Sequence, residues 1–129
     1  MSPVASVLAV DDEPRMRSAL RCLVEATWRS AIIDEAESGE AAVARVQELE
    51  PDVVLMDVRM PGVGGIAATE TIKRIRPETL VLLVSSTHPD ELPRAARECH
   101  ADAILWKSRL RPQALNEVWA RHAKRTDSC

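Results

Sequence analysis

Short apolar runs that alternate with longer segments of helical periodicity constrain the fold of this chain more than any other feature. The apolar runs are residues 7–10, 31–36, 53–56, 80–84 and 103–106. Most of them are apolar at every position, which is typical of strands buried on both faces of a parallel sheet. In the segments between them, apolar residues recur three and four positions apart, as on one side of a helix. Strands that alternate with helices in this way predict an α/β fold with a parallel sheet.

The signals at the helix starts agree with this pattern. Five helices are expected to begin near Pro14, Ser38, Ile66, Glu91 and Pro112. A proline suits the first turn, whose N–H groups have no helical partners, and a serine is a candidate N-cap. The fourth helix is expected to run from about residue 91 to about residue 99.

The second apolar run carries Asp34 and Glu35, so we expect it at the edge of the sheet. Crossover connections between parallel strands are right-handed, which places helices on both faces. These features favour the flavodoxin-like, doubly wound sheet of five parallel strands in the order 2-1-3-4-5.

The length and composition are those of one globular domain. The chain has 129 residues, of which 46% are hydrophobic and 29% are charged. We expect a single domain over residues 1–129, with a core from about 4 to 124 and a short polar tail at 125–129. A net charge of −3 argues against non-specific nucleic-acid binding, and aromatic residues at 2% argue against base-stacking surfaces.

The chain has no sequence signals for zinc binding, secretion or membrane insertion. Cys22, Cys99 and Cys129 lack the short spacing of a zinc site, so we expect reduced thiols. No apolar run approaches the ~20 residues that span a bilayer. Residues 7–10 lead directly into acidic residues, unlike a signal peptide. We therefore expect a cytoplasmic protein without a membrane segment.

Polar residues follow four of the five predicted strands. Asp11 and Asp12 come after the first, Asp57 after the third, Ser85 after the fourth and Lys107 after the fifth. The carboxyl ends of parallel strands lie along one edge of the sheet, where ligands bind near the switch in strand order. We expect these side chains to converge on one shallow cleft there.

Three crowded carboxylates and one ammonium group favour phosphoryl chemistry at a divalent cation. Carboxylate oxygens are ligands that Mg²⁺ prefers. The chain lacks a phosphate-binding loop and a nucleophile elbow, and its histidines do not follow strands. An aspartate beside Mg²⁺ can attack phosphorus to form an aspartyl-phosphate, while a lysine supplies further positive charge.

Four segments together resemble the receiver domain of two-component response regulators. They are residues 10–14, 55–62, 84–86 and 105–107. The resemblance extends from about residue 4 to about residue 124. Its most specific part is the Asp-x-x-Met-Pro-Gly sequence of residues 57–62 combined with the acidic pair and the lysine at these distances.

The resemblance implies a role for each residue of the predicted cleft. Asp57 would be the phospho-acceptor, Ser85 the switch hydroxyl that turns toward the phosphoryl group, and Lys107 its cationic partner. The implied Mg²⁺ ligands are Asp11, Asp12, Asp57 and the backbone carbonyl of Arg59. The phosphoryl donor would be a sensor histidine kinase, and phosphorylation could drive formation of a homodimer.

The chain departs from the family pattern near the fifth strand. Ile104 stands three residues before Lys107, where the family usually has an aromatic switch residue, so the signal could leave by backbone movement alone. Ser108 stands where many receivers have a proline after a cis bond, a conformation that costs ~2.5–4 kcal/mol without proline. His100 and Ala103 replace common glycines. We also expect the side chain of Arg59 to point over the cleft.

The Lys-Ser junction and the loop at residues 60–66 look most like NarL-type receivers, which a helix-turn-helix DNA-binding domain usually follows. The chain ends soon after its fifth predicted helix, so we expect DNA contacts only through an output domain outside this chain. The basic residues at 121–125 fit the start of a linker, or favourable charges at a helix C-terminus.

Two other functions remain open from the sequence. A phosphate-independent pseudo-receiver is favoured by Ile104 and Ser108 but disfavoured by the complete set of site residues. An aspartyl-phosphate phosphatase would need an acid two residues after Asp57, where Arg59 stands, and no aromatic residue that could hold a flavin follows a strand. We expect a signalling domain, whose phosphorylation shifts the loop and helix after the fourth strand, rather than a turnover enzyme.

Overall fold

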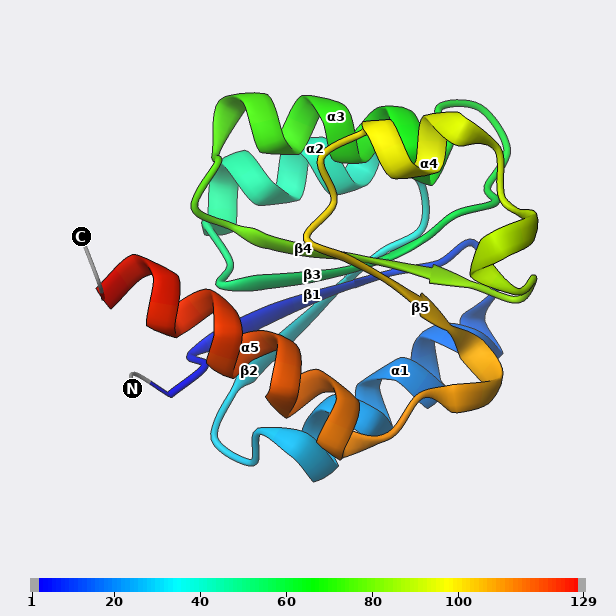
Figure 1. Ribbon diagram of the computed structural model, residues 1–129. Coiled ribbons are helices and arrows are strands. Elements are labelled where there is room, and N and C mark those ends of the chain that lie inside the picture. The colour runs from blue at the N-terminus through cyan, green and yellow to red at the C-terminus, as the bar shows by residue number, and fades with distance from the viewer. Residues whose placement is uncertain (1–2, 128–129) are drawn as a thin grey trace.

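The computed structural model describes residues 3–127, and the side chains of residues 3–123. It contains one parallel sheet between two layers of helices (Figure 1). The strands are β1 (Ser6–Val10), β2 (Ile32–Ala36), β3 (Val53–Asp57), β4 (Leu80–Ser85) and β5 (Ala103–Trp106). They lie in the order β2-β1-β3-β4-β5, and every neighbouring pair is parallel. The predicted fold is confirmed, including the edge position of the strand that carries Asp34 and Glu35.

The helices divide between the two faces of the sheet. They are α1 (Pro14–Thr27), α2 (Gly39–Leu49), α3 (Gly65–Ile75), α4 (Arg94–Glu98) and α5 (Pro112–Asp127), with 3-10 turns η1 (Pro89–Glu91) and η2 (Lys107–Arg109). In Figure 1, α2, α3 and α4 cover one face, and α1 and α5 cover the other. Because α5 extends to residue 127, part of the predicted tail is helical. Its last two residues, 128–129, lie outside the described residues.

Capping explains where α2 begins. The Ser38 hydroxyl accepts a hydrogen bond from the backbone N–H of Ala41 at 3.1 Å, so the predicted N-cap is present.

The fourth helix is shorter than predicted, and Pro93 supplies the reason. A proline disfavours the helical conformation in the residue before it, and Leu92 accordingly has an extended ψ of 151°. The helix predicted over residues 91–99 is therefore present but begins later, because the segment consists of η1, an extended break and the five-residue α4.

The sheet is buried at its centre and partly exposed at both edges. All residues of β3 and β4 are buried, whereas all four residues of β5 are half-buried. Alternate side chains of the strands pack into separate cores on the two faces. Trp119 belongs to the core under α1 and α5 and is 9% exposed, whereas His122, one turn further along α5, is half-buried.

Candidate functional site

The carboxyl edge of the sheet brings acidic side chains together. Asp11 follows β1 directly, and Asp57 is the last residue of β3, which pairs with β1. One carboxylate oxygen from each of Asp11, Asp12 and Asp57 can be chosen so that all three lie within 4.8 Å of one another. Asp11 and Asp57 are 1% and 5% exposed, whereas Asp12 is exposed to solvent. The cluster therefore has a buried wall and one open side.

Lys107 lies between the two buried carboxylates. Its Nζ is 3.1 Å from Oδ1 of Asp57 and 3.3 Å from Oδ2 of Asp11. A single ammonium group cannot neutralise three ionised carboxylates, so the cluster keeps an excess of negative charge.

This crowding changes the proton affinities of the site. Burial raises the pKa of Asp57, the negative charges of Asp11 and Asp12 add to that rise, and the hydrogen bond from Lys107 opposes it. Burial alone would lower the pKa of Lys107, but its hydrogen bond with Asp57 and the charges of Asp57 and Asp11 raise it above the usual value. The lysine therefore remains a cation at neutral pH.

The start of α1 braces the acidic turn. Oδ1 of Asp11 accepts a hydrogen bond from the N–H of Glu13 at 2.9 Å, and Arg17 donates to the Asp11 carbonyl at 2.8 Å. Arg17 and Arg21 both form ion pairs with Glu35 on β2, at 3.0 and 2.8 Å. These ion pairs were not predicted from the sequence, although two arginines four residues apart on one helix face and an acidic edge strand were the available signal.

The Ser85 hydroxyl is bonded to the loop that follows β4. It donates to the carbonyl of Thr87 at 2.7 Å and accepts from the N–H of the same residue at 3.0 Å. Ser85 is 2% exposed and is paired in register with Trp106 on β5. The hydroxyl therefore holds the start of the β4–α4 loop.

The residues that depart from the family pattern adopt distinct local structures. His100 has a left-handed φ of 70°, a conformation that glycine adopts more readily. No cis peptide bond occurs in the described chain, so the Lys107–Ser108 bond is trans and opens η2. Ile104 is half-buried against the core beneath α2, α3 and α4. Arg59 is exposed in the loop after β3.

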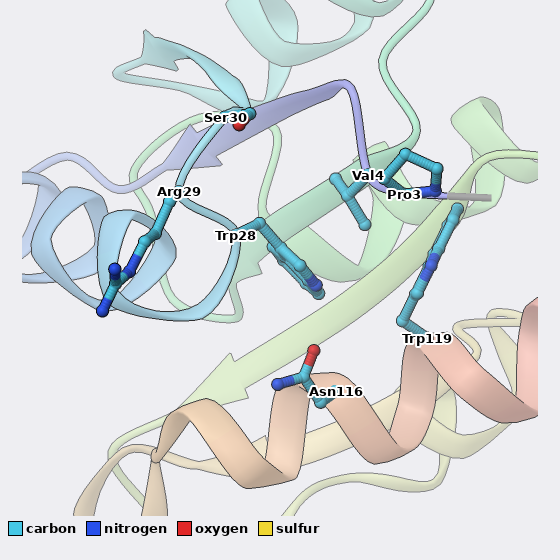
Figure 2. Close-up of a pocket in the computed structure, with 7 residues that line it drawn as sticks. All are labelled: Pro3, Val4, Trp28, Arg29, Ser30, Asn116 and Trp119. Carbon is cyan, nitrogen blue, oxygen red and sulfur yellow. The ribbon is translucent and has the colours of Figure 1, made fainter. Parts of the chain in front are cut away.

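Two of the three tryptophans lie at the opposite end of the strands, near the residues that precede β1. Trp28 and Trp119 line a pocket of about 340 Å³ beside Val4, which precedes β1. Figure 2 shows the two indoles on either side of this space, with the Asn116 side chain between them and Arg29 turned away. Trp106 instead ends β5, where it precedes Lys107 directly and is paired in register with Ser85.

The donor set suits a hard divalent cation. Mg²⁺ is bound by a few carboxylate oxygens together with water and phosphate oxygens. The acidic cluster offers carboxylate oxygens close enough to share one ion, and its exposed side admits water or a phosphoryl group. The side chains present therefore fit Mg²⁺.

The family model described as the response regulator receiver domain matches residues 7–118 of the chain. The chain belongs to this family. Receiver domains are signalling domains that interact with histidine kinases and generally bind Mg²⁺ at an acidic site.

Related proteins and structures support this assignment. The chain is 38% identical to the transcriptional regulatory protein YdfI of Bacillus subtilis over 101 residues, which cover 78% of this chain and 47% of YdfI. It is 35% identical to the chemotaxis protein CheY of Halobacterium salinarum over 112 residues, covering 87% of this chain and 92% of CheY. The NarL receiver domain of Mycobacterium tuberculosis superposes with a TM-score of 0.81 at 26% identity, covering 95% of this chain and 98% of that one.

The chain spans about half the length of most of the curated regulators that it matches. Within the described residues, no helix combines the length and hydropathy that a membrane span requires.

Proposed function

We propose that this chain is one receiver domain, which accepts a phosphoryl group from a sensor histidine kinase on the carboxylate of Asp57. The observation that carries the proposal is the position of this carboxylate, buried at the end of β3, 3.1 Å from the Lys107 ammonium and grouped with Asp11 and Asp12. Burial raises the pKa of this carboxylate and so makes it a stronger nucleophile, and the Lys107 ammonium can pair with a phosphoryl oxygen.

In the transfer step, an oxygen of Asp57 attacks the phosphorus of the kinase phosphohistidine. The bond between phosphorus and the histidine nitrogen breaks, the nitrogen keeps the electron pair, and an acyl phosphate forms on Asp57. Lys107 moves with little displacement from the carboxylate to a phosphoryl oxygen, because it already lies within 3.1 Å of the attacking side chain. Hydrolysis of the acyl phosphate by water restores the carboxylate and releases inorganic phosphate.

The acidic cluster would hold Mg²⁺ through Asp11, Asp12, Asp57 and the backbone carbonyl of Arg59. When bound, the ion supplies positive charge to the phosphoryl oxygens. The brace formed by Arg17 and the N–H of Glu13 fixes the main chain and the carboxylate of Asp11 before any ligand arrives.

Phosphorylation gives the Ser85 hydroxyl a new acceptor. We propose that the hydroxyl leaves the Thr87 carbonyl and donates to a phosphoryl oxygen, which frees the β4–α4 loop. The short α4, which ends after five residues, is a segment that such a release can move.

The outcome of this switch would be control of transcription through a DNA-binding output domain outside this chain. The basis is the resemblance to NarL-type receivers, and a relative named as a transcriptional regulatory protein of which the chain covers 47%. Phosphorylation would also favour a homodimer, and the site of action would be the cytoplasm, where receivers meet their kinases.

The test is the intact mass of the protein after incubation with Mg²⁺ and acetyl phosphate. Wild type should gain one phosphoryl group, and Asp57→Asn and a sample treated with a chelator should gain none. Absence of the gain in wild type, with acetyl phosphate and with a panel of histidine kinases, would favour the phosphate-independent interaction module suggested by Ile104 and Ser108.

A further inference from the structure

An aromatic and cationic cluster lies at the carboxyl end of β5, outside the residues proposed to hold the phosphoryl group and Mg²⁺. We call His88, Trp106 and Arg109 the Trp106 cluster. The His88 ring meets the indole edge-on, with ring centroids 5.0 Å apart and planes at 65°. The guanidinium carbon of Arg109 is 5.8 Å from the centre of the indole. Trp106 is half-buried, while His88 and Arg109 are exposed.

The cluster is connected to the Ser85 hydroxyl through Thr87. Ser85 holds Thr87 through two hydrogen bonds, and His88 is the next residue in the chain. The Nδ1 atom of His88 accepts a hydrogen bond from the N–H of Asp90 at 3.1 Å, which caps η1. The β4–α4 loop is therefore attached at two points, to Ser85 at its start and to Trp106 through His88.

On its other side, the indole contacts the segment that leads to α5. Arg109 ends η2, which begins at Lys107 and precedes α5 by two residues. Trp106 thus contacts one segment that depends on Ser85 and a second segment that carries Lys107. Ile104 lies on the same face of β5 but packs inward against the core. Among the described residues of β5, Trp106 is the side chain that reaches the loop with an aromatic ring.

We propose that Trp106 is a positioning residue that couples the β4–α4 loop to η2 and the start of α5. This inference rests on the proposed phosphorylation of Asp57. When Ser85 turns to the phosphoryl group, Thr87 loses both hydrogen bonds and His88 moves with it. The indole, held between His88 and Arg109, transfers that displacement to η2. Without the ring, the loop still responds to phosphorylation but the segment after β5 does not.

The test is amide hydrogen exchange, read by mass spectrometry, with and without Mg²⁺ and acetyl phosphate. Wild type should change its exchange in two peptides, one over residues 86–92 and one over residues 107–114. Trp106→Leu and His88→Ala should keep the first change and lose the second. The double variant should lose no more of the second change than either single variant, because both substitutions remove the same contact between His88 and Trp106. Trp106→Phe keeps an aromatic ring and should retain the second change.

The control is Trp28→Leu, which makes the same replacement at the opposite end of the strands and should leave both changes intact. His88→Ala alters an exposed side chain, so it tests the coupling even where Trp106→Leu lowers stability.

Intact masses of the same samples separate the possible failures. If wild type gains no phosphoryl group from acetyl phosphate or from a panel of histidine kinases, both the proposed function and this inference fail. If all variants gain the group and the response of residues 107–114 persists without the ring, only the inference fails. A folded Trp106→Leu variant that gains no phosphoryl group would place the indole in the site chemistry and would likewise overturn the coupling role.

Discussion

Two lysines pair with aspartates at the ends of this sheet, and the pairs differ in their charge balance. Lys73 donates to Asp102 at 2.9 Å and also to the carbonyls of Pro77 and Thr79. The same Asp102 oxygen accepts the N–H of Val81 at 2.8 Å. One cation meets one carboxylate, and backbone groups use the remaining hydrogen-bonding capacity. This pair joins the end of α3 to the segment before β5.

Lys107 instead meets two buried carboxylates, with a third beside them. The site keeps excess negative charge and an open side, which is a poor arrangement for stability and a suitable one for a cation and a phosphoryl group. A lysine–aspartate contact alone therefore does not indicate function. The charge that is left unpaired, and its access to solvent, distinguish the two sites.

Removing the lysine of the balanced pair should have the largest effect on stability. We expect Lys73→Met to lower the free energy of unfolding by about 3 kcal/mol, because it leaves a largely buried carboxylate without its cation. Urea denaturation measures this loss. Arg74→Met, at the exposed neighbour on α3, is the control. An equal loss in both variants would mean that the pair does not stabilise the fold.

Mg²⁺ should stabilise the folded protein, and it should do so through the acidic cluster and not through the Lys73–Asp102 pair. At an ion concentration tenfold above the dissociation constant, the free energy of unfolding should rise by about 1.4 kcal/mol, since the ion binds the folded state. Thermal unfolding with and without Mg²⁺ measures the gain. Asp11→Asn should reduce it, whereas Asp52→Asn, outside the cluster, should not. A similar gain in Asp11→Asn would remove this carboxylate from the metal site.

Neutralising an acid should have opposite effects at the two sites. Burial and the neighbouring carboxylates raise the pKa of Asp57, so its ionised form destabilises the fold at neutral pH. We expect Asp57→Asn to raise the free energy of unfolding by about 1 kcal/mol and Asp102→Asn to lower it. Both variants are compared by urea denaturation at pH 7 without Mg²⁺. Destabilisation by Asp57→Asn would mean that the cluster is balanced after all.

The ion pairs of Arg17 and Arg21 with Glu35 should make a smaller contribution to the free energy of unfolding, and that contribution should depend on pH. Hydrogen bonds from Arg21 and Arg17 lower the pKa of Glu35, although partial burial opposes them. Its stabilising contribution is therefore present above the usual glutamate pKa of 4.5 and is lost as the pH falls through the lowered pKa. We expect the stability difference between wild type and Glu35→Gln to shrink over that range. A difference that stays constant between pH 6 and pH 3 would contradict the ion pairs.

The sequence predicted the strand order and the convergence of polar groups because both follow from local patterns. Apolar runs define the strands, and the residue after each run must lie at the carboxyl edge of a parallel sheet. The acidic nature of Asp34 and Glu35 also placed β2 at the edge, as observed.

Contacts between distant segments could not be predicted in this way. The Lys73–Asp102 pair depends on where α3 ends relative to β5, and the contact between His88 and Trp106 depends on the path of a loop. Trp28 and Trp119 line one pocket because α1 and α5 pack side by side, which no sequence spacing reveals. The break at Leu92 is different, since the proline that causes it was visible in the sequence.

The position of the phosphoryl group tests the account most directly. An aspartyl-phosphate can be reduced with borohydride to homoserine, which tandem mass spectrometry locates in the chain. After treatment with Mg²⁺ and acetyl phosphate, the account predicts homoserine at position 57 and unmodified aspartate at positions 11 and 12. Homoserine at Asp11 or Asp12 instead, or an unmodified Asp57 in protein that has gained a phosphoryl group, would contradict it.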